Sequence, residues 1–577
     1  MKKTWIYLIF FLLICYLSGY SQQGIPAGYF ASPLKINLEA TGAFAEIRAN
    51  HFHSGIDFKT LKKEGIPILA VADGFVSRIK VSPVGFGNAL YIDHPCGYTS
   101  VYGHMLKYNN LIGNYVYNKQ YEMQSFAADL FPARDQDTFW IKKGDTIGFS
   151  GNSGTSYGAH LHFEMRTTIT ERILNPYLFG YDNTDQYYPY FDLFKVYPMD
   201  NSSSVGASDE PVQYGVRNPE QGLYYLDGVD TLFLWGNFAF GVQAFDYMYN
   251  HKDRNGFYGL RMLVDNVLCF SMQCDSFSFD ESRNINACID YPAYYKSGYR
   301  IVKSNRLPGN ALSFFKTPVN NGVVPFTDGK AHSLVFEVYD IMGRVSRLTV
   351  PVVSRQPGKM VSVTDIVDAD TICRINYDIA NRVMYHNLDV TIPASALYEN
   401  LDLTIKELPT ANGLYSARYA VHNPETPLQK NYTVSIKADK VPASLADKAL
   451  IVYINPGSGR RSSEGGKMER GWISAETNRF GVFSIAVDNQ KPSVKLVHQK
   501  PSKAKSVKVI VKDDLSGIAG YRGEINGQWA LVEWDPKYRL MIYRYDQLLK
   551  TGKNVFKLTV WDKAGNTAVF TTPVNKK

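Results

Sequence analysis

Two histidines near residue 160 have a spacing that suits metal or proton chemistry. The stretch from Gly148 to Glu164 reads GFSGNSGTSYGAHLHFE and passes from turn-forming residues into an alternating pattern. Side chains of a strand alternate between its two faces, so His160, His162 and Glu164 share one face. The alternate residues from Leu161 to Met165 are apolar and share the other face. We therefore expect a strand that packs one face into a core and holds both imidazoles on the other.

Two upstream stretches supply candidate partners for these histidines. NHFHSGIDFKT contains His53 and Asp57, which face the same way in an extended chain, with Gly55 as a bend between them. His51 has the same parity and competes with His53, and VYGHM adds His104. A catalytic zinc usually takes three ligands from His, Asp and Glu and leaves one position for water. These residues are candidates for such a site, although any one of them alone would more often be structural.

Other polar residues of this region have a structural interpretation that is at least as good as a functional one. His94 in DHPCG is typical of a hairpin turn, and Asn88 in GFGNAL of a turn with a possible substrate contact. Tyr102 lies on the same strand face as His104, where a packed tyrosine is expected. Glu164 shares the histidine face, but strand ends often carry solvated glutamates.

The motifs together resemble one family. The HxxxD of His53 to Asp57, the YGHM, the GDTIGFSGNSG approach and the HxH of His160 to His162 are similar to the lysostaphin/LytM-like zinc endopeptidases of the cell wall. The resemblance covers residues 45–165 approximately and implies a small antiparallel β-sheet with an open groove. It implies one Zn²⁺ per chain, with His53, Asp57 and His162 as ligands. It also implies that His104 and His160 are catalytic.

The implied chemistry follows from that assignment. Zinc lowers the pKa of bound water from near 16 to roughly 7. His160 is the candidate base that takes the water proton and returns it to the leaving amine. His104 would donate to the oxyanion of the scissile carbonyl, and the two roles could be exchanged. The segment between His104 and Lys142 is an insertion that we expect to border the groove, as a helix or a loop.

Composition and the amino terminus indicate the cellular setting. The net charge of +8 is spread along the chain without a nucleic-acid-binding motif, so no nucleic-acid partner is expected. Residues 1–21 resemble a secretory signal peptide, with two lysines, an apolar WIYLIFFLLICYL and a cut after Ser21. A lipoprotein anchor at Cys15 is the alternative, which the preceding Ile14 disfavours. We expect an exported protein of the periplasm, cell envelope or outer surface, with no transmembrane segment after signal cleavage.

Length and patterning predict several β-rich domains. A chain of 577 residues is too long for one core, and its many Tyr, Phe and Gly residues favour β structure. We predict a mainly β protein with an antiparallel LytM-like peptidase domain at 22–200 and a linker at 201–211. Three β-sandwich (Ig-like) modules are expected at 212–354, 355–489 and 490–577. Two similar hairpins are predicted, with strands ending at Asp340 and Asp562 and turns at Gly343 and Gly565. Cys269, Cys274 and Cys288 are close enough in sequence for one disulfide.

These expectations lead to a functional hypothesis and a rival. The hypothesis is an exported zinc metalloendopeptidase that hydrolyses peptide cross-links of peptidoglycan, with its peptide stems as substrate and the β-modules docked on envelope components. The rival is a catalytically silent LytM-like protein that binds and activates another cell-wall hydrolase. Such members typically lack a metal ligand, whereas this sequence retains the full set. A structural zinc site is a third possibility, against which the extra histidines argue.

Overall fold

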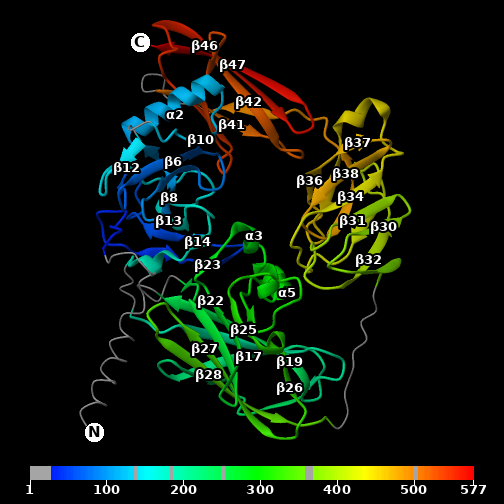
Figure 1. Ribbon diagram of the computed structural model, residues 1–577. Coiled ribbons are helices and arrows are strands. Elements are labelled where there is room, and N and C mark those ends of the chain that lie inside the picture. The colour runs from blue at the N-terminus through cyan, green and yellow to red at the C-terminus, as the bar shows by residue number, and fades with distance from the viewer. Residues whose placement is uncertain are drawn as a thin grey trace, which may run out of the picture.

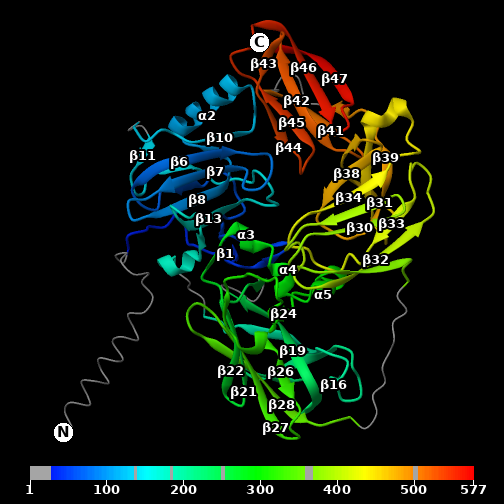
Figure 2. The same cartoon turned by 45° about the vertical axis from the view of Figure 1, so that its right-hand side comes forward.

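The computed structural model describes residues 28–135, 139–181, 186–247, 254–357, 368–497 and 505–576. The signal peptide expected at 1–21, with Cys15, lies outside these residues. The chain is mainly β, as predicted, and forms four β-rich units (Figure 1). In both views the path turns back on itself, so that the fourth unit lies beside helix α2 (Asn110–Met123) of the first (Figure 2).

An antiparallel sheet in the first unit contains the strand predicted near residue 160. This strand, β13, spans His160–Thr167. Leu161, Phe163 and Met165 are fully buried in the core of the unit, so the predicted alternation is confirmed. The main path of the sheet runs β1 (Ala40–Gly42), β4 (Ile56–Lys59), β13, β8 (Tyr98–Met105), β7 (Asn88–Asp93), β6 (Gly74–Val81) and β10 (Ala128–Leu130).

The insertion after His104 forms helix α2 beside a smaller sheet. Asn109 begins the helix, because its side chain accepts a hydrogen bond from the Ile112 amide as an N-cap. The smaller sheet has the order β5 (Pro67–Leu69), β12 (Thr146–Phe149) and β9 (Lys107–Tyr108). The strand β12 leads into the loop before β13, so this sheet anchors the glycine-rich approach to the two histidines.

The second unit begins earlier than the sequence indicates. The residues expected to form a linker at 201–211 include β16 (Ser204–Val205), which pairs with β19 (Leu232–Tyr247). Ser203 and Ser204 are buried, and the Ser203 hydroxyl accepts from the Asn237 amide. The Ser203 hydroxyl thus satisfies a backbone amide of the sheet instead of remaining solvated. β15 (Tyr190–Pro198), which falls in the range expected for the first domain, also pairs with β19.

The large sheet of the second unit continues from these strands. Its main path adds β17 (Val212–Glu220), β18 (Leu223–Leu226), β28 (Val345–Ser354), β27 (Ala331–Tyr339), β21 (Gly259–Val264), β22 (Val267–Gln273) and β25 (Phe315–Pro318). β20 (Arg254–Asn255), β24 (Val302–Lys303) and β26 (Val324–Phe326) pair with β19. Three short helices, α3 (Phe279–Ser282), α4 (Ile285–Cys288) and α5 (Tyr291–Ser297), lie between β22 and β25 in the chain.

The first and second units share a hydrophobic core. Phe44 and Phe52 of the first unit are buried in the core of the second. β14 (Ile173–Leu174) of the first sheet also pairs with β23 (Ser276–Phe277) of the second unit. Apolar burial between them stabilises a fixed arrangement, so the second unit is a structural partner of the first.

The third and fourth units each place two antiparallel sheets around one core. In the third unit one sheet is β29 (Thr371–Ile375), β32 (Leu401–Leu408), β33 (Arg418–Val421), β39 (Gly481–Val487), β35 (Ala449–Ile454) and β36 (Arg461–Gly465). The other is β30 (Asn381–Tyr385), β31 (Leu388–Ile392), β34 (Tyr432–Lys437), β38 (Trp472–Thr477) and β37 (Lys467–Glu469). The fourth unit has β40 (Ser493–Leu496), β41 (Ser506–Lys512), β45 (Leu540–Arg544) and β44 (Val532–Asp535), facing β43 (Gln528–Ala530), β42 (Ile518–Ile525), β46 (Gly552–Asp562) and β47 (Thr567–Lys576).

Both predicted hairpins are present. β27 pairs with β28, and β46 pairs with β47. The two turns close in the same way, because Gly343 donates from its amide to the Asp340 carbonyl and Gly565 to the Asp562 carbonyl. Both glycines have positive φ angles of 83° and 77°, a region that glycine occupies without steric cost.

Two further features bear on the expectations from the sequence. The cysteines of the described residues, including Cys269, Cys274 and Cys288, are all free, so the disulfide considered among these three does not form. Cys274 and Cys288 are both buried in the hydrophobic core of the second unit. Among the helices described, none is long and apolar enough to cross a membrane.

Candidate active site

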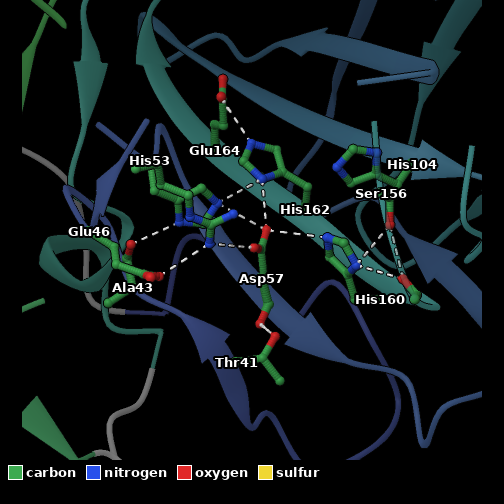
Figure 3. Close-up of polar contacts among 12 residues, drawn as sticks. Thr41, Ala43, Glu46, His53, Asp57, His104, Ser156, His160, His162 and Glu164 are labelled. Atoms are coloured by element: carbon green, nitrogen blue, oxygen red, sulfur yellow. Dashed lines mark hydrogen bonds and ion pairs between the residues drawn. The ribbon is translucent and has the colours of Figure 1, made fainter. Parts of the chain in front are cut away.

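Neighbouring strands bring the candidate ligands together. β4 and β13 are antiparallel neighbours, and Asp57 is the register partner of His162, so their side chains share one face of the sheet. His53 comes from the segment just before β4 and turns toward the same point (Figure 3). Gly55 allows this approach, because a Cβ there would lie 2.3 Å from the Phe163 carbonyl oxygen. The sequence HSGID therefore packs flat against β13 while it directs both ligands inward.

Three potential ligand atoms converge in this face. His53 Nε2 lies 3.0 Å from Asp57 Oδ1 and 3.1 Å from His162 Nδ1. His162 Nδ1 lies 2.9 Å from the same Asp57 oxygen. All three residues are buried. Two imidazole nitrogens and one carboxylate oxygen at such mutual distances fit one tetrahedral zinc, whose bonds to these atom types are about 2.0–2.2 Å.

Each ligand is oriented by a second contact. His53 donates from Nδ1 to the Ala43 carbonyl at 2.8 Å, which leaves Nε2 unprotonated and available to a metal. His162 donates from Nε2 to Glu164 Oε1 at 3.0 Å, which leaves Nδ1 available. Arg48 donates to Asp57 Oδ2 at 3.1 Å. Such contacts fix the tautomer and direction of metal ligands.

Glu164 is part of this support, contrary to the expectation of a solvated strand end. The residue is fully buried, and Arg166 donates to its second oxygen from Nε at 2.8 Å. Burial by itself raises the pKa of the Glu164 carboxyl, but the charge of Arg166 and the hydrogen bond from His162 outweigh it and lower the pKa to about 2. The carboxylate is therefore ionised, as an acceptor for His162 requires. Sequence parity placed Glu164 on the correct face but carried no signal of its burial.

The two remaining histidines lie beside the ligand atoms. His160 Nε2 is 3.4 Å from Asp57 Oδ1, and His160 Nδ1 donates to the Gly158 carbonyl at 2.9 Å (Figure 3). His104 donates from Nδ1 to the Ser153 carbonyl at 2.8 Å, and its ring centroid lies 4.8 Å from that of His160. Burial, together with the charges of His162 and His160, lowers the pKa of His104 to about 3. The His104 imidazole is therefore neutral at neutral pH.

A cleft of about 1400 Å³ opens over these five residues. Part of its wall comes from the second unit, through Phe279, Ser282 and Arg283. Tyr157 and Phe279 expose aromatic surface to it. Helix α2 does not line this cleft, so the expectation that the insertion borders the groove is wrong. The helix follows β9, which pairs with the edge of β12 opposite β5. It faces the fourth unit instead of the cleft.

The other polar residues considered from the sequence have structural contacts. His51 is exposed at the cleft and bonds the Ala49 carbonyl, outside the ligand group. His94 is buried between the Asp73 carbonyl and the Ser100 hydroxyl. Tyr102 is buried and accepts from the Val71 amide. Asn88 donates from its side chain to the Met105 carbonyl. The interpretation of Tyr102 as a packed residue is confirmed.

Replacing Glu164 with glutamine should weaken zinc binding about 10- to 100-fold, because the amide is a weaker acceptor for His162. The affinity can be measured by competition with a chromophoric chelator after circular dichroism has verified the fold. Glu171→Gln is the matched control, since the Glu171 side chain is 70% exposed in the same strand–turn region. Equal affinity in Glu164→Gln and the wild type would contradict the orienting role.

Comparison with known families agrees with this geometry. Residues 51–121 match the model for peptidase family M23. Residues 373–488, which cover most of the third unit, match the model for a Zu5-like domain.

Relatives and solved structures match over part of the chain. An uncharacterized metalloprotease of Haemophilus influenzae is 29% identical over 165 residues, which are 27% of this chain and 29% of the relative. The DD-carboxypeptidase/endopeptidase Mpg of Neisseria meningitidis is 27% identical over 157 residues, 27% of this chain and 26% of the relative. The matches thus span less than a third of each relative. The catalytic domain of the M23 protein EnpA from Enterococcus faecalis is 25% identical, with a TM-score of 0.19, over 27% of this chain and 97% of that domain. The first unit is a domain of peptidase family M23, the family of LytM-like peptidases that the sequence motifs resemble.

Proposed function

We propose that this protein is an exported zinc metalloendopeptidase that hydrolyses peptide cross-links of peptidoglycan. The observation that carries the proposal is the convergence of three ligand atoms below the cleft, with two further histidines beside them. The M23 domain and relatives named metalloprotease and DD-carboxypeptidase/endopeptidase support a peptidase. The full set of metal ligands disfavours a silent binding protein.

His53, Asp57 and His162 would hold one zinc per chain. Two neutral imidazoles and one carboxylate leave the site with a net positive charge when the metal is bound. A zinc ion in such a site polarises the scissile carbonyl and lowers the pKa of a coordinated water to about 7. Arg48, Glu164 and the Ala43 carbonyl keep the three ligands in place.

His104 and His160 provide the proton chemistry. Each donates from Nδ1 to a backbone carbonyl, so Nε2 is the nitrogen left for chemistry in both, and in the neutral His104 it carries a lone pair. An imidazole in that state accepts a proton from attacking water and delivers it to the leaving amine. Stabilising the oxyanion by hydrogen bonding instead requires a proton on Nε2.

This requirement favours the exchanged assignment of the two roles. The neutral His104 presents an acceptor at Nε2 and is therefore the base in our proposal. His160 directs Nε2 toward the Asp57 carboxylate at 3.4 Å, an acceptor that pairs with an N–H group, and it serves as the donor to the oxyanion in our proposal. The sequence suggests His160 as base and His104 as donor, with exchange as the alternative.

The walls of the cleft suit a branched, anionic peptide. Tyr157 and Phe279 offer apolar surface for side chains, and Lys62 and Arg283 add positive charge. Peptide stems of the cell wall carry free carboxylates, which a cationic cleft attracts. A wide opening between two units also accommodates a cross-link with chains on both sides of the scissile bond.

The test is hydrolysis of defined material by the zinc-loaded full chain. Incubation with purified sacculi and with cross-linked muropeptides should release new peptide ends, identified by mass spectrometry, which also locates the bond cut. A chelator should stop the release and added zinc should restore it. No new ends from either substrate, in protein that binds one zinc, would reject the enzyme. Digestion only when a second hydrolase is added would indicate an activator instead.

Export is tested separately. Fractionation of the producing cells should place the protein in the envelope or outside the cell. Mass spectrometry of its amino terminus should identify Gln22 as the first residue. A lipid-modified Cys15 would indicate the lipoprotein alternative, and full-length protein in the cytoplasm would reject export.

A further inference from the structure

The fourth unit makes direct contact with the first. The Tyr121 hydroxyl of α2 donates to the Asp546 carboxylate, and the Tyr121 ring meets Trp529 edge-on at 5.0 Å. Arg522 donates to the side-chain oxygen of Gln124, at the end of α2, at 2.9 Å. The two views of the ribbon show this unit seated over the helix (Figures 1 and 2). The insertion after β9 thus serves as a docking surface within the chain.

Lys537 extends the contact to the loop before β13. It lies in the turn between β44 and β45, and its Nζ donates to the carbonyl oxygens of Asn152 and Gly154, the latter at 3.2 Å. Its side chain is only 12% exposed. The two carbonyls flank Ser153 in the chain, so one ammonium group binds the loop on both sides of that residue.

Ser153 is the residue that orients His104. Its carbonyl accepts the Nδ1 proton of His104 at 2.8 Å. Its hydroxyl donates to the Met105 carbonyl at 2.8 Å and accepts from the Asn88 amide at 2.9 Å. His104 itself has a φ angle of 57°, in the left-handed region that is uncommon for residues other than glycine. Its direction therefore depends on the contacts around it, in which the ring packs against Phe86, His160 and His162 and donates a hydrogen bond to the Ser153 carbonyl.

The loop is held between two surfaces. On one side Gly154 packs against Gly87 so closely that a Cβ at Gly154 would lie 2.3 Å from the Gly87 nitrogen. On the other side Lys537 binds the backbone carbonyls. Loss of the ammonium group would remove the second of these constraints and let the Ser153 carbonyl shift relative to His104.

We propose that Lys537 is a positioning residue for the reaction, supplied by the fourth unit. It fixes the acceptor that sets the tautomer and direction of His104, although it lies outside the cleft. The effect on catalysis rests on the proposed function, whereas the contact with the loop does not. The fourth unit is then a working part of the peptidase and not only a spacer or an envelope-binding module.

Lys537→Met tests this role, because methionine retains the apolar stem and lacks the charge. We expect kcat on a defined muropeptide to fall about tenfold through misplacement of His104, with KM unchanged. Zinc content should be that of the wild type. Lys537→Arg should restore most of kcat. Lys553→Met is the matched control, an exposed lysine of β46 in the same unit, and should behave as the wild type.

A double-mutant cycle separates positioning from a general structural effect. If Lys537 acts through His104, Lys537→Met should cause no further loss in a His104→Ala background. The same fold-loss in both backgrounds, or no loss in the wild-type background, would overturn the proposal.

Hydrogen exchange gives a readout that needs no activity. In the zinc-loaded protein, the backbone amides of residues 150–158 should exchange faster in Lys537→Met than in the wild type. In Lys553→Met their exchange rates should equal those of the wild type. Unchanged exchange in Lys537→Met would overturn the contact. Faster exchange in a protein whose wild type cleaves no peptide would uphold the contact and reject the proposed function.

Discussion

Asp57→Ala should leave a folded protein that contains no stoichiometric zinc and hydrolyses no muropeptide above background. Asp57 contributes the only anionic ligand of the three that converge, and its Oδ1 lies within 3.0 Å of both ligand nitrogens. Without it, His53 and His162 remain as two neutral ligands, and Arg48 loses one of its two carboxylate partners and keeps only Glu46. Two imidazoles without an anionic ligand, next to a guanidinium, are a poor site for a dication.

Metal analysis of dialysed protein and product analysis of muropeptide digests measure this loss. Asp129→Ala is the control, because Asp129 is a partly exposed carboxylate of the same sheet that pairs with Arg78 outside the cleft. That variant should retain one zinc and full turnover. One zinc per chain in Asp57→Ala would contradict the proposed ligand set, since another residue would then be completing the site. If Asp57→Ala kept its zinc but hydrolysed no muropeptide, Asp57 would have a role in catalysis and none in metal binding.

Local patterns were sufficient to predict the strand that holds His160 and His162. Leu161, Phe163 and Met165 alternate with polar residues, and burial of one face requires that register. The same reasoning placed both hairpins, whose turns carry a glycine in the left-handed region. Candidate ligands could be chosen because their residue types are few and their parity is fixed by extended backbone.

Features that depend on distant segments were beyond local patterns. The sequence favours a solvated Glu164, because nothing nearby reveals that it is buried with Arg166 beneath His162. The Ser203 region resembles a linker in composition, yet the Ser203 hydroxyl accepts a hydrogen bond from β19, a strand that follows later in the chain. Phe279 lines the cleft from the second unit, a position that also depends on packing between segments distant in the sequence. Tertiary packing decided each of these cases, and composition alone does not encode it.

The division of labour among the histidines is the least predictable part, because it depends on hydrogen bonds to the backbone. The sequence presents His160 and His162 as equivalent members of one strand face. In the structure His162 turns Nδ1 toward His53 and Asp57, whereas His160 turns Nδ1 to the Gly158 carbonyl and Nε2 to the edge of the site. Only the first of these arrangements completes the ligand set.

His160→Ala should therefore retain one zinc per chain and lose turnover. The loss expected for a residue that transfers a proton or donates to the oxyanion is about 10²- to 10⁴-fold in kcat. Zinc affinity should change little, since the three ligand atoms and their supports belong to other residues. Zinc analysis and kcat on the same preparation make the comparison direct.

His51→Ala is the matched control for this variant. His51 also lies at the cleft but is exposed and outside the ligand group, so its removal should leave both zinc and kcat near the wild-type values. Loss of zinc in His160→Ala would mean that His160 is itself a ligand and that the assignment of His162 or His53 is wrong. Full turnover in His160→Ala would leave His104 as the single proton-transfer group, because no other histidine of the described cleft, apart from the ligands and His51, faces the site. Zinc content and kcat, measured on the same variant, thus distinguish a metal ligand from a catalytic residue on one strand face.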